Sequence, residues 1–246
     1  MIDGEGRPRP AFYAARPGGW RDWWTLLHPP YTAWHLSYVV IGASLAPRVD
    51  LARLLWTLLA FLFAVGLAAH ALDELHGRPL GTQIPTPVLV GLTVAGLAGA
   101  VALGVIGLSR VGWPLVPFMV VGPLLVIAYN WELFGGAVHS DVGFALAWGS
   151  FPVLVGYVAQ TGRLALGPIV AAGAALALSA AQRRLSTPAR TIRRRTTAVE
   201  GHVTFGDGTS LPLDADRLLA PLETALHAMS WSVVLVAAAL AVTRLG

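Results

Sequence analysis

The sequence contains no cysteine and no lysine. The absence of cysteine excludes disulfide bonds and thiolate chemistry, and the absence of lysine excludes Schiff-base catalysis and a phosphate-binding P-loop lysine. Charged residues make up only 12% of the chain, against 55% hydrophobic residues. Together with a mean hydropathy of +0.64, this composition predicts a protein that crosses a membrane several times.

The hydrophobic residues form continuous runs, which predict transmembrane helices rather than the alternating pattern of a β-barrel. A helix needs about 20 apolar residues to cross the hydrocarbon core. We therefore predict an all-α polytopic bundle of about seven spans. The predicted spans are 31–47, 52–72, 86–108, 112–130, 142–161, 164–183 and 220–243.

The arginines predict the orientation of these spans. If the N-terminus is cytoplasmic, five of the 17 basic residues lie outside. These five are Arg48, Arg53, Arg110, Arg163 and Arg244. The other twelve lie inside, so the excess favours an N-in, C-out protein of the inner cell membrane. Basic clusters in such a chain set topology or contact anionic lipid, and we expect no nucleic-acid partner.

The chain divides into a polar N-terminal cytoplasmic segment, 1–30, and a helix bundle, 31–246. The N-terminal segment lacks the basic-then-apolar pattern of a cleaved signal peptide. In the last inside loop, "HVTFGDGTSLPL" at 202–213 predicts a small hairpin turning at Asp207-Gly208. The following "DADRLLAPLETALHAM" predicts an amphipathic helix at the membrane interface before the last span.

The second predicted span ends in four ionisable residues within seven positions, His70, Asp73, Glu74 and His76. On a helix His70, Asp73 and Glu74 share one face. Carboxylates there suit Mg²⁺, and histidine ligands would widen the choice to other divalent metals. The alternative is a helix end whose polar residues meet water.

Further polar residues fall at the same predicted membrane face. The fourth span ends "YNWELFGGAVHSD", which adds Asn130, Glu132, His139 and Asp141. Ionisable residues that converge at one membrane face predict a functional site. The sixth span ends "SAAQRRLSTPARTIRRR". Its arginines could bind a diphosphate in bidentate fashion, or anchor the chain to anionic lipid.

Two stretches resemble the UbiA superfamily of intramembrane prenyltransferases, loosely over residues 25–195. "LHPPYTAWHLSYVVIGASLAP" is similar to the first span of that family. "GFALAWGSFPVLVGYVAQTG" is similar to the fifth span, and carries Pro152, Gly156, Tyr157, Gln160, Thr161 and Gly162. The polar residues after the second span fall where the family has its first acidic motif, Asn-Asp-x-x-Asp-x-x-x-Asp.

The resemblance implies a helical bundle with a lipid-accessible cavity, where Mg²⁺ held by two acidic motifs binds a prenyl diphosphate. Asp73 occupies the middle acidic position, while His70 and Gly77 replace the first and last aspartates. The second motif is missing, because "AAQRRLSTPAR" contains no carboxylate. The family usually has nine spans, so two are lost or rearranged here.

These considerations predict transfer of a prenyl group to a lipid or aromatic acceptor at the cytoplasmic face. Asp73 and Glu74 are the expected catalytic residues, and Mg²⁺ or another divalent metal is the expected cofactor. The predicted metal ligands are Asp73, Glu74, His70, His139 and Asp141. The predicted substrate-binding residues are Arg78, Arg183, Tyr157, Gln160 and Asn130.

The missing second motif favours an alternative: a non-catalytic membrane module that binds an isoprenoid, a quinone-like lipid or a protein partner. Membrane lipid is a partner under either hypothesis.

Overall fold

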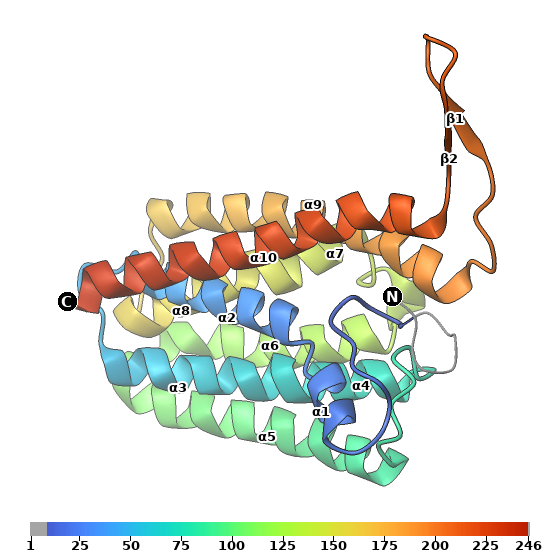
Figure 1. The fold of residues 1–246 in the computed structure, drawn as a ribbon. Helices are drawn as coiled ribbons and strands as arrows, with labels where there is room; N and C mark the ends of the chain where they lie inside the picture. Colours follow the sequence, from blue (N-terminus) through green and yellow to red (C-terminus); the bar gives the residue numbers. More distant parts are fainter. Residues whose placement is uncertain (1–8, 246) are drawn as a thin grey trace.

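The computed structural model describes residues 9–245 as a bundle of long helices with one hairpin projecting from it (Figure 1). The N-terminal half contains α1 (Trp20–Leu26), α2 (Pro29–Ser44), α3 (Leu51–Phe61), α4 (His70–Leu75), α5 (Thr86–Val111) and α6 (Val116–Asn130). The C-terminal half contains α7 (Asp141–Ala145), α8 (Phe151–Thr161), α9 (Leu166–Arg195), β1 (His202–Thr204), β2 (Ser210–Pro212) and α10 (Ala215–Leu245). The predicted all-α class is confirmed.

Two of the long helices contain a π-helical segment, in which each turn holds an extra residue. Leu62–Ala69 joins α3 to α4, and Leu146–Ser150 joins α7 to α8. The chain is helical without a break over Leu51–Leu75 and over Asp141–Thr161. Short 3₁₀ turns, Trp113–Leu115 and Phe134–Gly136, precede and follow α6.

Each of the seven predicted spans overlaps a helix of this bundle, although span 31–47 extends beyond the end of α2 at Ser44 and span 164–183 begins before α9 at Leu166. Five helical segments are long and apolar enough to cross a membrane: Leu51–Leu75, Thr86–Val111, Trp113–Asn130, Asp141–Thr161 and Ala215–Leu245. The shorter α2 and the arginine-bearing α9 complete the set, so the count of seven spans stays a prediction. Large apolar side chains such as Trp56 and Ile106 are more than half exposed, as expected for surfaces that face lipid.

The core is built around α2, which packs against α8 and α10. Trp34 and Tyr38 of α2 are almost completely buried. The contact between α2 and α8 depends on two glycines. A β-carbon at Gly42 would lie 2.0 Å from the Val153 carbonyl oxygen, and one at Gly156 would lie 2.3 Å from the Val39 carbonyl oxygen. Only glycine lets these two backbones approach so closely.

The predicted hairpin is present. Val203 of β1 pairs with Leu211 of β2 in antiparallel register, and the Asp207 carboxylate accepts hydrogen bonds from the Thr209 amide and hydroxyl across the turn. The hairpin projects from the end of the bundle that carries α1 and α4 (Figure 1).

Two differences from the predicted helices affect the description of the site. The predicted interfacial helix is not separate, because Ala215–Leu245 is one continuous helix that includes it. The sixth predicted span ended at residue 183, whereas α9 continues to Arg195. Its arginine-rich segment is therefore helical, although Pro188 removes one hydrogen bond to the preceding turn. Residues 1–8 of the predicted N-terminal segment lie outside the described residues.

Candidate functional site

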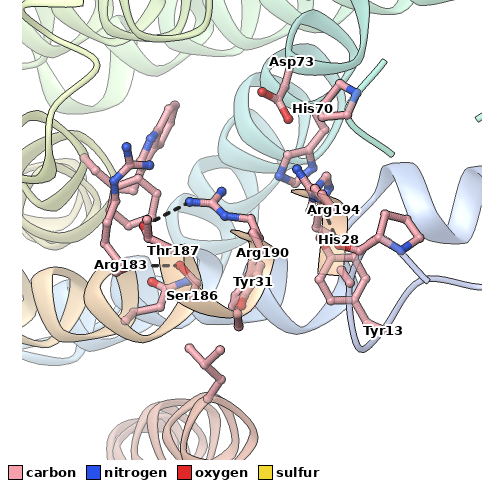
Figure 2. Close-up of a pocket in the computed structure, with 18 of the residues that line it drawn as sticks. Tyr13, His28, Tyr31, His70, Asp73, Arg183, Ser186, Thr187, Arg190 and Arg194 are labelled. Atoms are coloured by element: carbon pink, nitrogen blue, oxygen red, sulfur yellow. Dashed lines mark hydrogen bonds between the residues drawn. The ribbon is translucent and has the colours of Figure 1, made fainter. Parts of the chain in front are cut away.

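A polar cavity of about 410 Å³ lies at the end of the bundle from which the hairpin projects, and we call this the cavity end. Its wall combines residues 10–13 with the beginning of α2, the junction of the π-helix and α4, the end of α6, the C-terminal half of α9 and part of α10. Figure 2 shows side chains from these separate elements pointing into the shared space. The sequence predicted such a convergence of polar residues at one face, and the structure has it.

One wall of the cavity is formed by a single face of α9. Arg183, Thr187, Arg190 and Arg194 lie at spacings of four, three and four residues, so they share that face. Arg183 donates to the Asp141 carboxylate at 2.9 Å and to the Tyr129 hydroxyl at 2.7 Å. It is therefore held at the rim by two partners.

The two arginines further along this face are less engaged. Arg190 makes only a long contact, 3.4 Å, to the Thr187 hydroxyl. Arg194 donates through Nε to the Pro10 carbonyl at 3.0 Å. Among the described residues neither guanidinium forms an ion pair with a carboxylate, and both approach Asp73 from across the cavity (Figure 2).

The neighbouring carboxylates Asp73 and Glu74 face different surroundings. Asp73 lines the cavity, and no hydrogen bond joins its carboxylate to another described residue. Glu74 is fully buried and turned away from the cavity. Its oxygens accept hydrogen bonds from the Leu80 amide at 3.0 Å, and from the Thr82 amide and hydroxyl at 2.8 Å each.

The prediction that Glu74 is a catalytic residue and metal ligand is therefore wrong. All of its hydrogen bonds hold the loop that follows α4. Arg78 has a similar structural role, because it donates to the carbonyls of Thr82 and Ile84 and to the Thr86 hydroxyl. Arg78 does not line the cavity, which corrects its assignment to substrate binding.

Four of the five described histidines that line the cavity share one arrangement, in which Nδ1 contacts a backbone carbonyl oxygen. The pairs are His28 with Leu26 at 2.7 Å, His35 with Trp148 at 2.9 Å, His70 with Gly66 at 3.2 Å and His139 with Tyr129 at 2.9 Å. Because a carbonyl oxygen only accepts, Nδ1 carries a proton in each of these rings.

The side chain of His28 is buried in this wall. Its ring lies 4.1 Å from the ring of His70, centroid to centroid. Burial lowers the pKa of His28 to about 4, so the ring is neutral at pH 7. Burial also raises the pKa of the nearby Tyr13 phenol well above its ordinary value.

The predicted metal ligands do not assemble. Asp141 pairs with Arg183, His139 stacks on Tyr129 at 4.4 Å, and Glu74 faces the loop. Within residues 9–245, no three or more His, Asp or Glu side chains are grouped so that they could hold a metal ion. The residues of this cavity do not fit the magnesium cluster that the resemblance implied.

Two predicted substrate-binding residues lie at the opposite end of the bundle. Gln160 accepts from the Asp50 amide at 2.8 Å, and its own backbone carbonyl accepts from Arg53 at 2.9 Å. Tyr157 is buried near it in α8, and neither residue lines the cavity. Their assignment is therefore corrected as well. Asn130 and Arg183 do line the cavity.

Sequence reasoning missed Tyr13 and Tyr31, and it considered Arg190 and Arg194 only as members of an arginine-rich stretch, although all four residues line the cavity. The arginines carried a usable signal, because the helical spacing of Arg183, Arg190 and Arg194 is visible in the sequence. It was lost because the sixth span was ended at residue 183. The tyrosines lie in or beside the polar N-terminal segment, and nothing local marks them.

No protein-family model matches this sequence, and no curated protein matches it. The structure does resemble solved structures. A UbiA homologue from Archaeoglobus fulgidus bound to Cd²⁺ has a TM-score of 0.54 and 16% identity, over 91% of this chain and 85% of the other. A second structure of a UbiA homologue from that organism has a TM-score of 0.52 and 15% identity, over 89% and 82%. The UbiA-like fold implied by the sequence resemblance is confirmed.

Proposed function

On the basis of this UbiA-like fold, we propose that the protein binds an isoprenoid diphosphate and transfers its prenyl group to a lipid or aromatic acceptor at the cytoplasmic face. The observation that carries the proposal is the pairing of two adjoining cavities of opposite character. One is the polar cavity described above. The other is an apolar pocket between helices of the bundle.

The apolar pocket has a volume of about 330 Å³ and lies among α3, α5, α6 and α8. Phe118, Phe151 and Leu125 are among the side chains that line it. Val65 and Trp148 line both this pocket and the polar cavity. Both residues lie in the π-helical segments, so the two chambers meet where these segments face the interior. An amphiphile with an anionic head and an isoprenoid tail matches this pair of chambers.

The chemistry would begin with cleavage of the bond between the prenyl C1 and the diphosphate oxygen. The diphosphate leaves with the electron pair, and the arginines of α9 stabilise its charge. The allylic cation is captured by a nucleophilic atom of the acceptor, which then loses a proton. Asp73 is placed to accept that proton, since its carboxylate lines the cavity with no hydrogen bond to another described residue.

Release of diphosphate tests this proposal. The full chain, in nanodiscs of a neutral lipid, is given a long-chain prenyl diphosphate together with a membrane lipid extract as acceptor. We expect diphosphate release and a prenylated product from the unaltered protein, with at least tenfold less from Asp73→Asn. Full turnover by Asp73→Asn would exclude the role of Asp73, and absence of any product would exclude transfer.

A second candidate is a non-catalytic module that binds an isoprenoid or a quinone-like lipid. The absence of a metal-binding group among the described residues favours it. Saturable binding of the prenyl diphosphate without any turnover would support this candidate over the enzyme.

A further inference from the structure

We infer that the anionic head is bound directly by arginine, without a metal ion, in a cradle formed by Arg190 and Arg194 of α9. This inference rests on the proposed function, because it concerns the diphosphate end of the same ligand. It begins from the disagreement noted above: the fold implies a magnesium cluster, but the cavity does not hold its carboxylates.

The first argument is the balance of charge in the cavity wall. Arg183, Arg190, Arg193, Arg194 and Arg195 line it, against three carboxylates. Among the residues that the structure describes, those carboxylates are Asp73, Glu132 and Glu223. A wall that must collect divalent cations needs an excess of carboxylate oxygens. This wall has the opposite excess, which suits a polyanion directly.

The second argument is which arginines are already engaged. Arg193 forms a two-pronged pair with Glu223, with Nη2 donating to Oε2 at 2.7 Å, and it is largely buried. Arg183 is shared between Asp141 and Tyr129. These two arginines hold α9 against α10 and α6. Of the three remaining arginines, Arg190 and Arg194 share the face of α9 that lines the cavity, and their guanidinium groups point into it (Figure 2).

The third argument is the spacing of the two guanidinium groups. Arg190 and Arg194 lie four residues apart on one helix, so two like charges are neighbours. Their repulsion lowers the stability of the unoccupied protein unless an anion lies between them. A guanidinium offers five N–H donors in a planar fork that matches phosphate oxygens, and it keeps its charge at any physiological pH. Two such forks one helical turn apart fit two linked phosphates.

Neighbouring hydroxyl groups extend the cradle. Thr187 lies one turn before Arg190 on the same face and already contacts it, and Ser186 lines the same cavity. The hydroxyl groups of Ser186 and Thr187 thus add neutral hydrogen-bond donors beside Arg190 (Figure 2). Asp73 faces the two arginines from across the cavity (Figure 2), so a diphosphate bound by the arginines would lie on the side of the cavity opposite this carboxylate.

The test is a binding titration of geranylgeranyl diphosphate to the full chain in neutral-lipid nanodiscs, with EDTA and then with Mg²⁺. We expect equal affinity in both, within about twofold. Because a hydrogen bond to a charged group contributes about a tenfold factor or more, Arg190→Gln and Arg194→Gln should each weaken binding about tenfold, and the double variant about 100-fold. Arg184→Gln is the matched control, because Arg184 lies on the same helix but does not line the cavity.

The outcomes separate this inference from the proposed function. Binding that requires Mg²⁺ and is lost in Asp73→Asn overturns the arginine cradle but retains a diphosphate site. Unchanged binding by the double variant also overturns it. No binding under either condition overturns both proposals.

A final arm distinguishes the source of the phosphate. Nanodiscs containing an anionic phospholipid are compared with neutral ones at the same ionic strength. If the unaltered protein loses geranylgeranyl diphosphate binding in the anionic discs, the phospholipid competes with the diphosphate. If the double variant shows no such difference between anionic and neutral discs, the lipid competes at Arg190 and Arg194, and the cradle is reassigned to a lipid headgroup. Retained binding in the anionic discs supports the diphosphate assignment.

Discussion

The two ends of the bundle both carry charged and polar groups on apolar helices, but they use them differently. At the end opposite the cavity, which we call the capped end, Arg53 donates to the carbonyls of Gln160 and Arg110 at 2.9 and 2.7 Å. There Gln160 also accepts from the Asp50 amide, so the helix ends are tied to one another. At the cavity end, Asp73, Arg190 and Arg194 line open space instead. Polar groups that satisfy one another stabilise a fold, and polar groups left facing a cavity are available to a ligand.

Within the cavity end the same contrast separates adjacent residues. The Glu74 carboxylate accepts three hydrogen bonds from the loop, whereas the Asp73 carboxylate accepts none from a described residue. The first prediction tests this pair. Glu74→Ala leaves the buried amides of Leu80 and Thr82 without an acceptor, so the free energy of unfolding should fall by about 4 kcal/mol. Asp73→Ala should change it by less than about 1 kcal/mol.

Reversible unfolding by SDS titration from detergent micelles measures both variants. Equal losses of stability would mean that Asp73 is also a structural residue. In that case the distinction between the neighbouring carboxylates would disappear.

The second prediction concerns how the capped end is closed. A β-carbon at Gly156 would lie 2.3 Å from the Val39 carbonyl oxygen and 3.1 Å from the Ala43 amide nitrogen. Because both are backbone atoms of α2, Gly156→Ala must separate two core helices, and we expect a loss of about 3 kcal/mol. Gly91→Ala in α5 is the control, since nothing lies within 4 Å of its added carbon. A neutral Gly156→Ala would show that α2 and α8 are less tightly packed than described.

The third prediction uses the neutral histidine of the cavity wall. His28 has a pKa of about 4 in the folded protein, because burial disfavours its charged form. The ordinary value near 6.5 applies in the unfolded chain. Between these two values the unfolded state binds more protons, so stability falls as the pH is lowered. At pH 5, His28 alone should contribute a loss of about 2 kcal/mol relative to pH 8.

His28→Asn supplies the comparison, because asparagine tolerates the left-handed backbone that His28 adopts at φ 46°. Unfolding is measured at pH 8 and pH 5 for both proteins. The pH-dependent loss should be smaller in His28→Asn by that amount, and an identical loss in both would exclude His28 as its source.

The sequence was sufficient for the fold because continuous apolar runs and Gly/Pro breaks are local signals. It was less informative about the site, and Glu74 shows why. Helix periodicity places Asp73 and Glu74 about 100° apart, on either side of His70. Which of the two faces the cavity depends on the path of the loop that brings Leu80 and Thr82 to Glu74. That path is a tertiary feature without a local signal.

The misassignment of Gln160 and Tyr157 has a simpler geometric cause. The helix that contains them begins at Asp141 beside the cavity and runs away from it. At 1.5 Å per residue, Tyr157 lies about 24 Å further along the helix. The resemblance to a known span identified the helix correctly, but direction and length exclude these positions from the cavity.

The hairpin of β1 and β2 has a practical consequence for imaging. Small membrane proteins that are embedded in a micelle offer little mass outside the detergent for aligning particles in electron cryomicroscopy. This hairpin stands clear of the bundle (Figure 1), and its strands are held in a defined antiparallel register. A rigid marker domain inserted at the Asp207-Gly208 turn, or an antibody fragment raised against it, would give each particle a recognisable direction and leave the cavity residues unaltered.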